Sequence, residues 1–596
     1  MYRSKTRRRK AHSRPLLARA QGRFFGERSL KLAKIENLGE VVSTDLLIIG
    51  GGLAGLVAGI KAKEYPIDVL LVDKQTIGWS GKAPKVGGGL WVMLPEDDVD
   101  KFTEYHVRNI GCHLNDQELL SSYARESFGA IKQLTEWGVK LPQDAEGKLQ
   151  TARHPAGLWS GTGVDRDMLF PLRTRVQEMG AKILNKIQVV ELLKQGDRVV
   201  GAVGFGLMDG RFYIFKAKAT ILANGGCNYR VKRLWASGCG DGIATAYRAG
   251  AEMRNAEFGN FFDVDRKDID FPTASGAYAF LSNAVGENLS ERYVTRQEPD
   301  TPISIILGME KEVKEGRGPI YLDPSKTQWD PTKPPPFFAG RWGMPKVLDF
   351  WRLQASKQLK YGPAPSARVE VTAALNAELS PVKVDHGMKT SLGGLWAIGD
   401  ICYQGSAWAG AVPAPPGRLR GSGVMNTLFT SLRGGPPAAR FAAEAASPKM
   451  NDEEIERFKE EVFAPLKSDK GLSPDEAIYL IQDVVCKVKY NLRRSKDRLE
   501  EALSKIEEVQ HRLSELHAKD GHGLGKCHEA RSMALCAEMT LRAALMRTES
   551  RGSHFREDYP DRDDRNWLRW IIIKKKDGKM ALSTEPVPIE KYRVKV

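Results

Sequence analysis

The chain has 596 residues, enough for several hydrophobic cores, and its 42% hydrophobic and 28% charged composition is typical of a globular protein. No apolar run reaches the roughly 18 to 20 residues that cross a bilayer, which argues against an integral membrane protein. The seven cysteines are scattered and include no Cys-x-x-Cys pair, so the sequence predicts neither a disulfide framework nor a metal or iron–sulfur site of its own.

The net charge of +16 is concentrated at the N-terminus, where residues 1–40 hold twelve lysines and arginines against three glutamates. We predict a basic, disordered leader over residues 1–41, with an organelle presequence or a nucleic-acid-attracting arm as alternatives. No folded RNA- or DNA-binding module accompanies it, so we expect no nucleic-acid partner. We expect a cytoplasmic protein, or an organelle-matrix protein if the leader is a presequence.

The first predicted domain opens with a dinucleotide-binding βαβ unit. An apolar run leads into a glycine turn, a helix-compatible segment follows, and a second apolar run ends at Asp73. Gly50 permits the tight turn, Gly52 lets the backbone approach a pyrophosphate, and Gly55 lets the helix pack closely on the strand. The carboxylate of Asp73 can then accept hydrogen bonds from ribose hydroxyls.

Two distant segments favour a flavin over a nicotinamide cofactor. Ala217–Gly226 and Ser391–Asp400 are each a short apolar run that ends in glycines. They resemble the second and third fingerprints of flavoproteins with two dinucleotide-binding domains, which implies that Asp400 binds the ribityl chain. No second Gly-x-Gly-x-x-Gly segment has a βαβ context, so we expect no nicotinamide site.

The elements that follow the βαβ unit are predicted in chain order. Thr76–Leu90 is a glycine-rich loop suited to lie against a flat ring, and its Trp79 either covers that ring or packs elsewhere. Helices are expected over residues 115–138 and 165–180. We divide the chain into a leader and four further segments: 42–262 and 363–446 as the cofactor domain, 263–362 as an inserted cap, and 447–596 as a helical domain with its tail.

The last 150 residues are predicted to form a helical bundle. Ser473 caps a helix that begins with proline. An apolar stripe at three- and four-residue spacing marks a buried face of a second helix: Leu499, Leu503, Ile506, Val509, Leu513 and Leu516. The tail from Trp570 reads as a strand and turn that pairs with a neighbouring strand or a partner chain.

Three further segments carry a family resemblance, namely Gly240–Glu252, Glu315–Asp323 and Glu549–Asp564. Over residues 42–570 the chain resembles the flavoprotein subunits of fumarate reductase and succinate dehydrogenase, a family that includes aspartate oxidase and the adenylylsulfate reductase α subunit. The resemblance implies an α/β fold: a Rossmann-like FAD-binding domain, an inserted α+β cap and a C-terminal helical domain. The expected cofactor-binding residues are Gly50, Gly52, Leu53, Ala54, Gly55, Asp73, Lys74, Ser80, Gly81, Gly87, Gly88, Ala223, Gly225, Asp241, Gly399, Asp400 and Ser422.

The chain departs from this family where the family binds dicarboxylates. The family's covalent flavin histidine falls on Gly81, so we expect non-covalent FAD. The first substrate histidine is missing from Asn260–Asp263, two arginines of the proton-shuttle segment fall on Pro302 and Leu307, and the second histidine falls near Asn376. These losses make dicarboxylate chemistry doubtful.

Three residues are predicted to act at the substrate. Arg418-Leu-Arg420 resembles the family's Arg-Leu-Gly-Ser segment, so Arg420, or Arg418, is expected to bind an anionic substrate, with a phosphate or domain-seam contact as the alternative. His386 is a candidate base, or else a solvated histidine in a turn. Arg551 and His554 are expected to be structural, because relatives pack this segment between the helical and flavin domains.

The sequence predicts an FAD-dependent oxidoreductase, the catalytic flavoprotein subunit of a complex in which an iron–sulfur protein relays electrons. The substrate is expected to be a small anion. The non-covalent flavin and the lost dicarboxylate residues favour the adenylylsulfate-reductase-like branch of the family. A diverged fumarate reductase or aspartate oxidase, and an electron-transfer flavoprotein without its own substrate, are the alternatives. Membrane contact is expected at most through other subunits.

Overall fold

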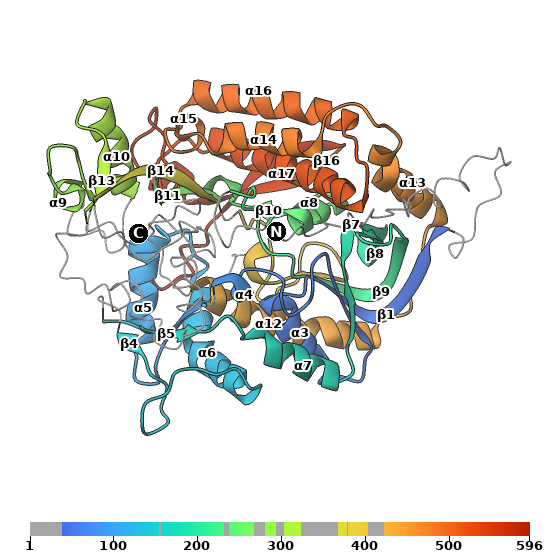
Figure 1. Ribbon diagram of the computed structural model, residues 1–596. Helices are drawn as coiled ribbons and strands as arrows, with labels where there is room; N and C mark the ends of the chain where they lie inside the picture. The colour runs from blue at the N-terminus through green and yellow to red at the C-terminus, as the bar shows by residue number, and fades with distance from the viewer. Residues whose placement is uncertain are drawn as a thin grey trace, which may run out of the picture.

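The computed structural model describes residues 38–86, 88–153, 157–231, 238–267, 281–293, 303–323, 368–377, 379–402 and 422–596. Residues 1–37 of the predicted leader, Gly87, Pro302, Arg418 and Arg420 lie outside the described residues, and the end of the predicted leader is already structured, because β1 begins at Glu40. In Figure 1 the C-terminal helices lie across the top of the molecule, above a central sheet with its own helices, and a small α+β unit lies at the upper left.

A mixed sheet of seven strands forms the centre of the molecule, in the order β6-β2-β1-β9-β8-β7 with β15 beside β9. Its strands are β1 (Glu40–Ile49), β2 (Val69–Asp73), β6 (Lys182–Asn185), β7 (Ile187–Gln195), β8 (Arg198–Gly206), β9 (Phe212–Leu222) and β15 (Leu395–Ala397). Strands β6, β2, β1, β9 and β15 run parallel, and β7 and β8 form antiparallel pairs.

The central sheet is buried on both faces, which explains its continuous apolar runs. Along β1, Leu46 and Ile48 belong to one core and Leu47 and Ile49 to the other, because successive side chains point to opposite faces. Helices on the first face are α3 (Leu53–Ala62), α7 (Leu169–Glu178) and α12 (Ser422–Glu444). Helix α8 (Asp241–Ala249) packs on β7 and on the C-terminal helices.

A second small sheet and several short helices join this domain. They are α4 (Ala83–Val86), β3 (Gly88–Val92), α5 (Val99–Tyr105), the π-helix η1 (His106–Ile110), α6 (Gln117–Glu136), β4 (Ala152–Arg153) and β5 (Ser160–Val164). Helix α6 lies within the predicted span 115–138. Helix α7 begins four residues later than predicted, because Met168 donates its N–H to the Asp165 carbonyl in a turn.

The described part of the inserted unit is an antiparallel sheet, in the strand order β11-β14-β13-β12, with the helices α9 and α10. It comprises β11 (Asn260–Arg266), β12 (Leu281–Ser282), α9 (Leu289–Tyr293), α10 (Ile303–Lys314), β13 (Ile320–Leu322) and β14 (Val369–Ala377). Strand β14 lies beyond the predicted end at residue 362, yet it pairs with β11 from Asn260 to Arg266. The sheet extends past both predicted limits, because the strand that leaves the insertion pairs with the strand that enters it.

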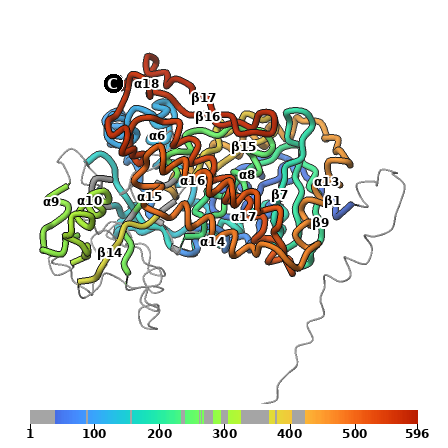
Figure 2. The backbone as a smooth tube through the Cα atoms, turned by 90° about the horizontal axis from the view of Figure 1, so that it is seen from above, coloured from blue at the N-terminus to red at the C-terminus, as the bar shows by residue number. Residues whose placement is uncertain are grey.

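The C-terminal region is helical, as predicted, and ends in a hairpin. Figure 2 shows α14, α16 and α17 running alongside one another. Ser473 caps α14 by accepting the Glu476 N–H at 3.2 Å, and the predicted stripe is buried along α16 and η8. The elements are α13 (Asp452–Phe463), α14 (Pro474–Val485), α15 (Val488–Asn491), α16 (Lys496–Arg512), η8 (Leu513–Glu515), α17 (Gly521–Met546), α18 (Asp564–Trp567), β16 (Arg569–Lys576) and β17 (Lys579–Pro586).

Strand β16 pairs with β17 and with β10 (Met253–Arg254), so the tail strand joins the C-terminus to the chain that precedes η2 (Ala256–Phe258) and β11. This confirms pairing with a neighbouring strand of the same chain. Within the described ranges, no helix has both the length and the apolarity that a membrane span requires.

Candidate functional site

The glycine turn between β1 and α3 leaves the start of α3 open to a ligand. A Cβ at Gly55 would lie 1.8 Å from the Gly50 carbonyl oxygen, so only glycine allows this helix to pack against its strand. Gly52 is the N-cap of α3 and contributes no side-chain hydrogen bond. The backbone N–H groups and the positive end of the helix dipole are therefore available to a phosphate.

The residues after β2 form a polar cluster at one end of this turn. Asp73 accepts the Gly51 N–H at 2.6 Å. Lys74 Nζ lies 2.6 Å from an Asp241 carboxylate oxygen and 2.7 Å from one of Glu529. Burial by itself would lower the pKa of Lys74, but these two carboxylates hold it well above its ordinary value. The predicted cofactor-binding residues Lys74 and Asp241 therefore lie together after the predicted ribose ligand Asp73, and Glu529 joins them from α17.

A second polar cluster lies where β15 ends. Gly399, with φ +75°, donates its N–H to Thr430 Oγ1 on α12 at 2.9 Å. The neighbouring Asp400 carboxylate, predicted to bind the ribityl chain, lies 2.6 Å from Lys82 Nζ. Sequence reasoning missed Lys82, although a lysine inside a glycine-rich loop is a signal that could have identified it.

Buried polar atoms between these clusters fit a long polar ligand. Ser80 Oγ, Asn224 Oδ1 and both amide atoms of Asn426 are buried and have no hydrogen-bond partner in the described part of the chain. Such orphans are rare unless water or a ligand satisfies them. A Cβ at Gly225 would meet nothing within 4 Å, which leaves room for a ligand against the backbone. These features fit FAD.

The structure gathers the predicted cofactor residues from three distant parts of the chain. Gly81, with φ +81°, lies against Gly52, because a Cβ placed on Gly81 would be 3.7 Å from the Gly52 Cα. Ala223 donates its N–H to the Ile49 carbonyl, which aligns the end of β9 with the glycine turn. The other predicted cofactor residues that the structure describes begin or end elements around this turn: Leu53 and Ala54 open α3, Gly88 opens β3, and Ser422 opens α12.

His386 lies in a surface ion pair, and the structure does not support its predicted role as a base. Its Nε2 lies 2.8 Å from Asp116 Oδ2, and its side chain is 48% exposed. Asp116 is the N-cap of α6, and its hydrogen bond raises the pKa of His386. The alternative of a histidine in a turn fits the structure better, because the imidazole stabilises the contact between that turn and α6.

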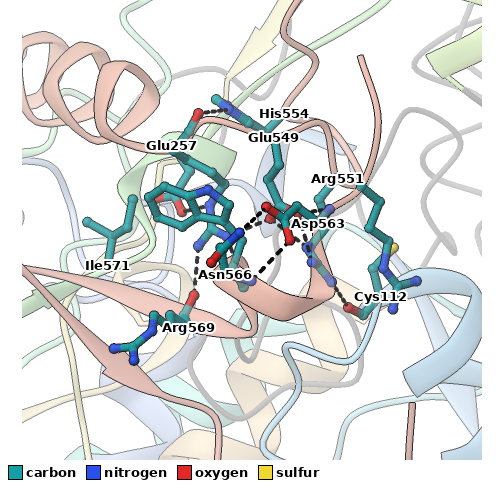
Figure 3. Close-up of polar contacts among 12 residues, drawn as sticks. Cys112, Glu257, Glu549, Arg551, His554, Asp563, Asn566, Arg569 and Ile571 are labelled. Carbon is teal, nitrogen blue, oxygen red and sulfur yellow. Dashed lines mark hydrogen bonds and ion pairs between the residues drawn. The ribbon is translucent and has the colours of Figure 1, made fainter. Parts of the chain in front are cut away.

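A buried charge cluster joins the C-terminal domain to the flavin domain (Figure 3). It comprises Glu257, Arg547, Glu549, Arg551 and His554 and is fully buried or nearly so. Arg547 bridges Glu257 at 2.7 Å and Glu549 at 2.8 Å. These contacts agree with the structural role predicted for Arg551 and His554.

The cluster also makes hydrogen bonds with two residues outside it, Cys112 and Arg494. Arg551 donates to the Cys112 carbonyl oxygen at 2.6 Å, and Arg494 lies 2.6 Å from His554 Nδ1. Burial and the Arg494 guanidinium hold the pKa of His554 well below its ordinary value. The imidazole therefore serves as a neutral hydrogen-bonding bridge.

Trp79 forms an aromatic pair at the surface. Its side chain is 55% exposed and packs on Phe170 with ring centroids 4.6 Å apart. The pair forms an apolar patch, and Trp79 directly precedes Ser80 and Gly81.

Residues 45–262 match the FAD binding domain family, and residues 483–596 match the fumarate reductase flavoprotein C-terminal family. The chain is 27% identical to one of the subunits of the CoM/CoB fumarate reductase from Methanothermobacter marburgensis, over 90% of this chain and 98% of that protein. It is 25% identical to the 8-methylmenaquinol:fumarate reductase flavoprotein subunit of Wolinella succinogenes, over 96% and 94% of the two chains.

Solved structures share the fold. The adenylylsulfate reductase of Archaeoglobus fulgidus superposes with a TM-score of 0.73 at 22% identity, over 95% of this chain and 98% of that one. A quinol fumarate reductase chain from E. coli gives a TM-score of 0.76 at 20% identity, over 93% and 98%. The chain therefore contains an FAD binding domain and a fumarate reductase flavoprotein C-terminal domain, and it is an FAD-dependent oxidoreductase similar to fumarate reductase flavoproteins.

Proposed function

We propose that this chain is the catalytic flavoprotein subunit of a larger oxidoreductase, that it holds FAD without a covalent bond, and that it exchanges electrons with a separate iron–sulfur protein. The observation that carries the non-covalent assignment is Gly81, which stands at the position of the respiratory histidine and has no side chain to form a bond. Acid precipitation should release all of the yellow colour into the supernatant. Colour that stays with the pellet would contradict this assignment.

Three observations support a separate electron-transfer partner. All seven cysteines are free thiols, and the described residues contain no group of three or more ligands that could hold a metal ion. Both sequence relatives described above are named as subunits. The exposed Trp79–Phe170 patch lies beside the flavin-binding loop, and exposed aromatic rings are enriched at protein interfaces. We place the docking surface of the iron–sulfur protein here.

Basic residues around this patch favour an acidic partner. Arg166 donates to the Pro84 carbonyl oxygen at 2.9 Å, and Arg173 packs against Gly78. Charge complementarity of this kind raises the rate of association more than it raises the affinity. The rate of electron exchange with an acidic ferredoxin should therefore fall steeply as salt is added.

We propose a small anion as the substrate. Bound FAD supplies two-electron chemistry at its N5, by hydride transfer or at a sulfur centre. The position of the family's first substrate histidine holds the buried Phe262, and the position of one of its proton-shuttle arginines holds Leu307 of α10. Arg420 or Arg418 remains the expected anion-binding residue.

The test is anaerobic reoxidation of the dithionite-reduced protein, followed at the flavin absorbance band. The panel contains fumarate, adenylylsulfate, sulfite with AMP, and iminoaspartate precursors. Rapid reoxidation by one compound would identify the substrate class. Fast exchange with a ferredoxin and no response to any panel compound would contradict a catalytic role and favour an electron-relay flavoprotein.

A further inference from the structure

Three lysines lie along the cofactor-binding groove, and one of them has no partner among the described residues. Lys74 pairs with Asp241 and Glu529 at one end, and Lys82 pairs with Asp400 at the other. The side chain of Lys85, in the short helix α4, is partly buried and makes no hydrogen bond or ion pair with any residue that the structure describes.

Lys85 lies in the turn that follows Lys82, since its backbone N–H donates to the Lys82 carbonyl oxygen at 3.0 Å. Burial and the nearby ammonium groups of Lys82 and Lys74 lower the pKa of Lys85. FAD is built in the order ribityl chain, diphosphate, ribose. Asp400 stands at the predicted ribityl position and Lys74 beside the predicted ribose position, so the middle of the groove is the place of the diphosphate.

The short helix that carries Lys85 is held in place. Arg166 donates to the carbonyl oxygen of Pro84, the residue before Lys85, at 2.9 Å. The loop leading into α4 lies over the N-terminus of α3, because a Cβ at Gly52 would be 3.7 Å from the Ser80 carbonyl oxygen. Lys85 therefore belongs to an anchored turn that follows directly on the loop over the phosphate-binding end of α3.

We propose that Lys85 is a direct ligand of the FAD diphosphate in this chain. The helix N-terminus offers neutral N–H groups and a partial charge, whereas a diphosphate brings two full negative charges into a partly buried groove. The Lys85 ammonium supplies a full compensating charge, and a charge-assisted hydrogen bond to a phosphate oxygen is among the stronger polar contacts in proteins. The inference rests on FAD binding, not on the substrate or partner proposed above.

The test is equilibrium binding to protein stripped of flavin, with no dependence on turnover. Affinities for FAD, ADP and adenosine are measured by calorimetry for the wild type, K85Q, K85M and K85R. ADP contains the diphosphate without the flavin, and adenosine contains neither. Lys140→Gln serves as the matched control, because Lys140 is exposed and lies after α6.

K85Q and K85M should lower the affinities for FAD and for ADP by the same factor, about 10- to 100-fold, and leave the affinity for adenosine unchanged. K85R should retain most of the affinity, and K140Q should bind as the wild type does. A lower affinity for FAD with an unchanged affinity for ADP would show that Lys85 contacts the flavin half of the cofactor, and it would overturn the proposal. Equal losses for ADP and adenosine would show a damaged fold or ribose site, and unchanged affinity in both neutral variants would exclude the contact.

Discussion

Glu549→Gln should destabilise the protein far more than an ordinary glutamate substitution. The Glu549 carboxylate is fully buried and accepts four hydrogen bonds: one from Arg547 at 2.8 Å, two from Arg551 at 2.7 and 2.8 Å, and one from the Asp563 N–H at 2.9 Å. Glutamine keeps the shape but turns one acceptor into an NH₂ donor that faces guanidinium donors. Because two buried cations then lose a shared anion, we expect a loss of about 3–5 kcal/mol in the free energy of unfolding.

Glu557→Gln is the matched control in the same segment. The Glu557 side chain is 31% exposed and pairs with Arg493 and Arg498 at the surface. Solvent screens this contact, so its loss should cost less than about 1 kcal/mol. The assay is urea unfolding of the FAD-loaded variants, followed by the fluorescence of the twelve tryptophans, which include Trp567 beside the cluster. Equal destabilisation by the two variants would refute the buried-charge reasoning.

Three further outcomes follow from the geometry. Gly55→Ala should abolish FAD retention, because its Cβ would lie 1.8 Å from a backbone carbonyl oxygen; full flavin occupancy after purification would contradict this. The hydrogen bond to Asp116 raises the pKa of His386 in the folded state above its value in the unfolded chain. The ion pair therefore stabilises the fold fully at a pH below the unfolded-state pKa, and this stabilisation is lost as the pH rises through the folded-state pKa. The melting temperature of H386Q should therefore lie further below that of the wild type at pH 6 than at pH 9. An equal difference at the two pH values would contradict the ion-pair explanation. Trp79→Ser should slow electron exchange with an iron–sulfur protein and leave reduction by dithionite unchanged; slower dithionite reduction would place Trp79 at the flavin instead.

Sequence patterns among residues close together in the chain were sufficient to predict much of the fold. The glycine turn before α3 and the alternating faces of β1 follow from steric limits and side-chain direction within a few residues. The stripe along α16 was readable for the same reason, because its spacing matches the helical period. The motif around Glu549 carried part of the family resemblance, and its buried contacts agree with the expected structural role.

Only tertiary structure decided which distant charges meet. Lys74 pairs with Glu529, Lys82 pairs with Asp400, and His386 pairs with Asp116, although hundreds of residues separate each pair. No local pattern encodes such contacts, because they depend on which faces of the packed elements come together. The same reason explains β14, whose pairing with β11 extends the inserted sheet beyond its predicted limits. The sequence alone therefore determined the cofactor class, and packing decided which side chains surround the cofactor.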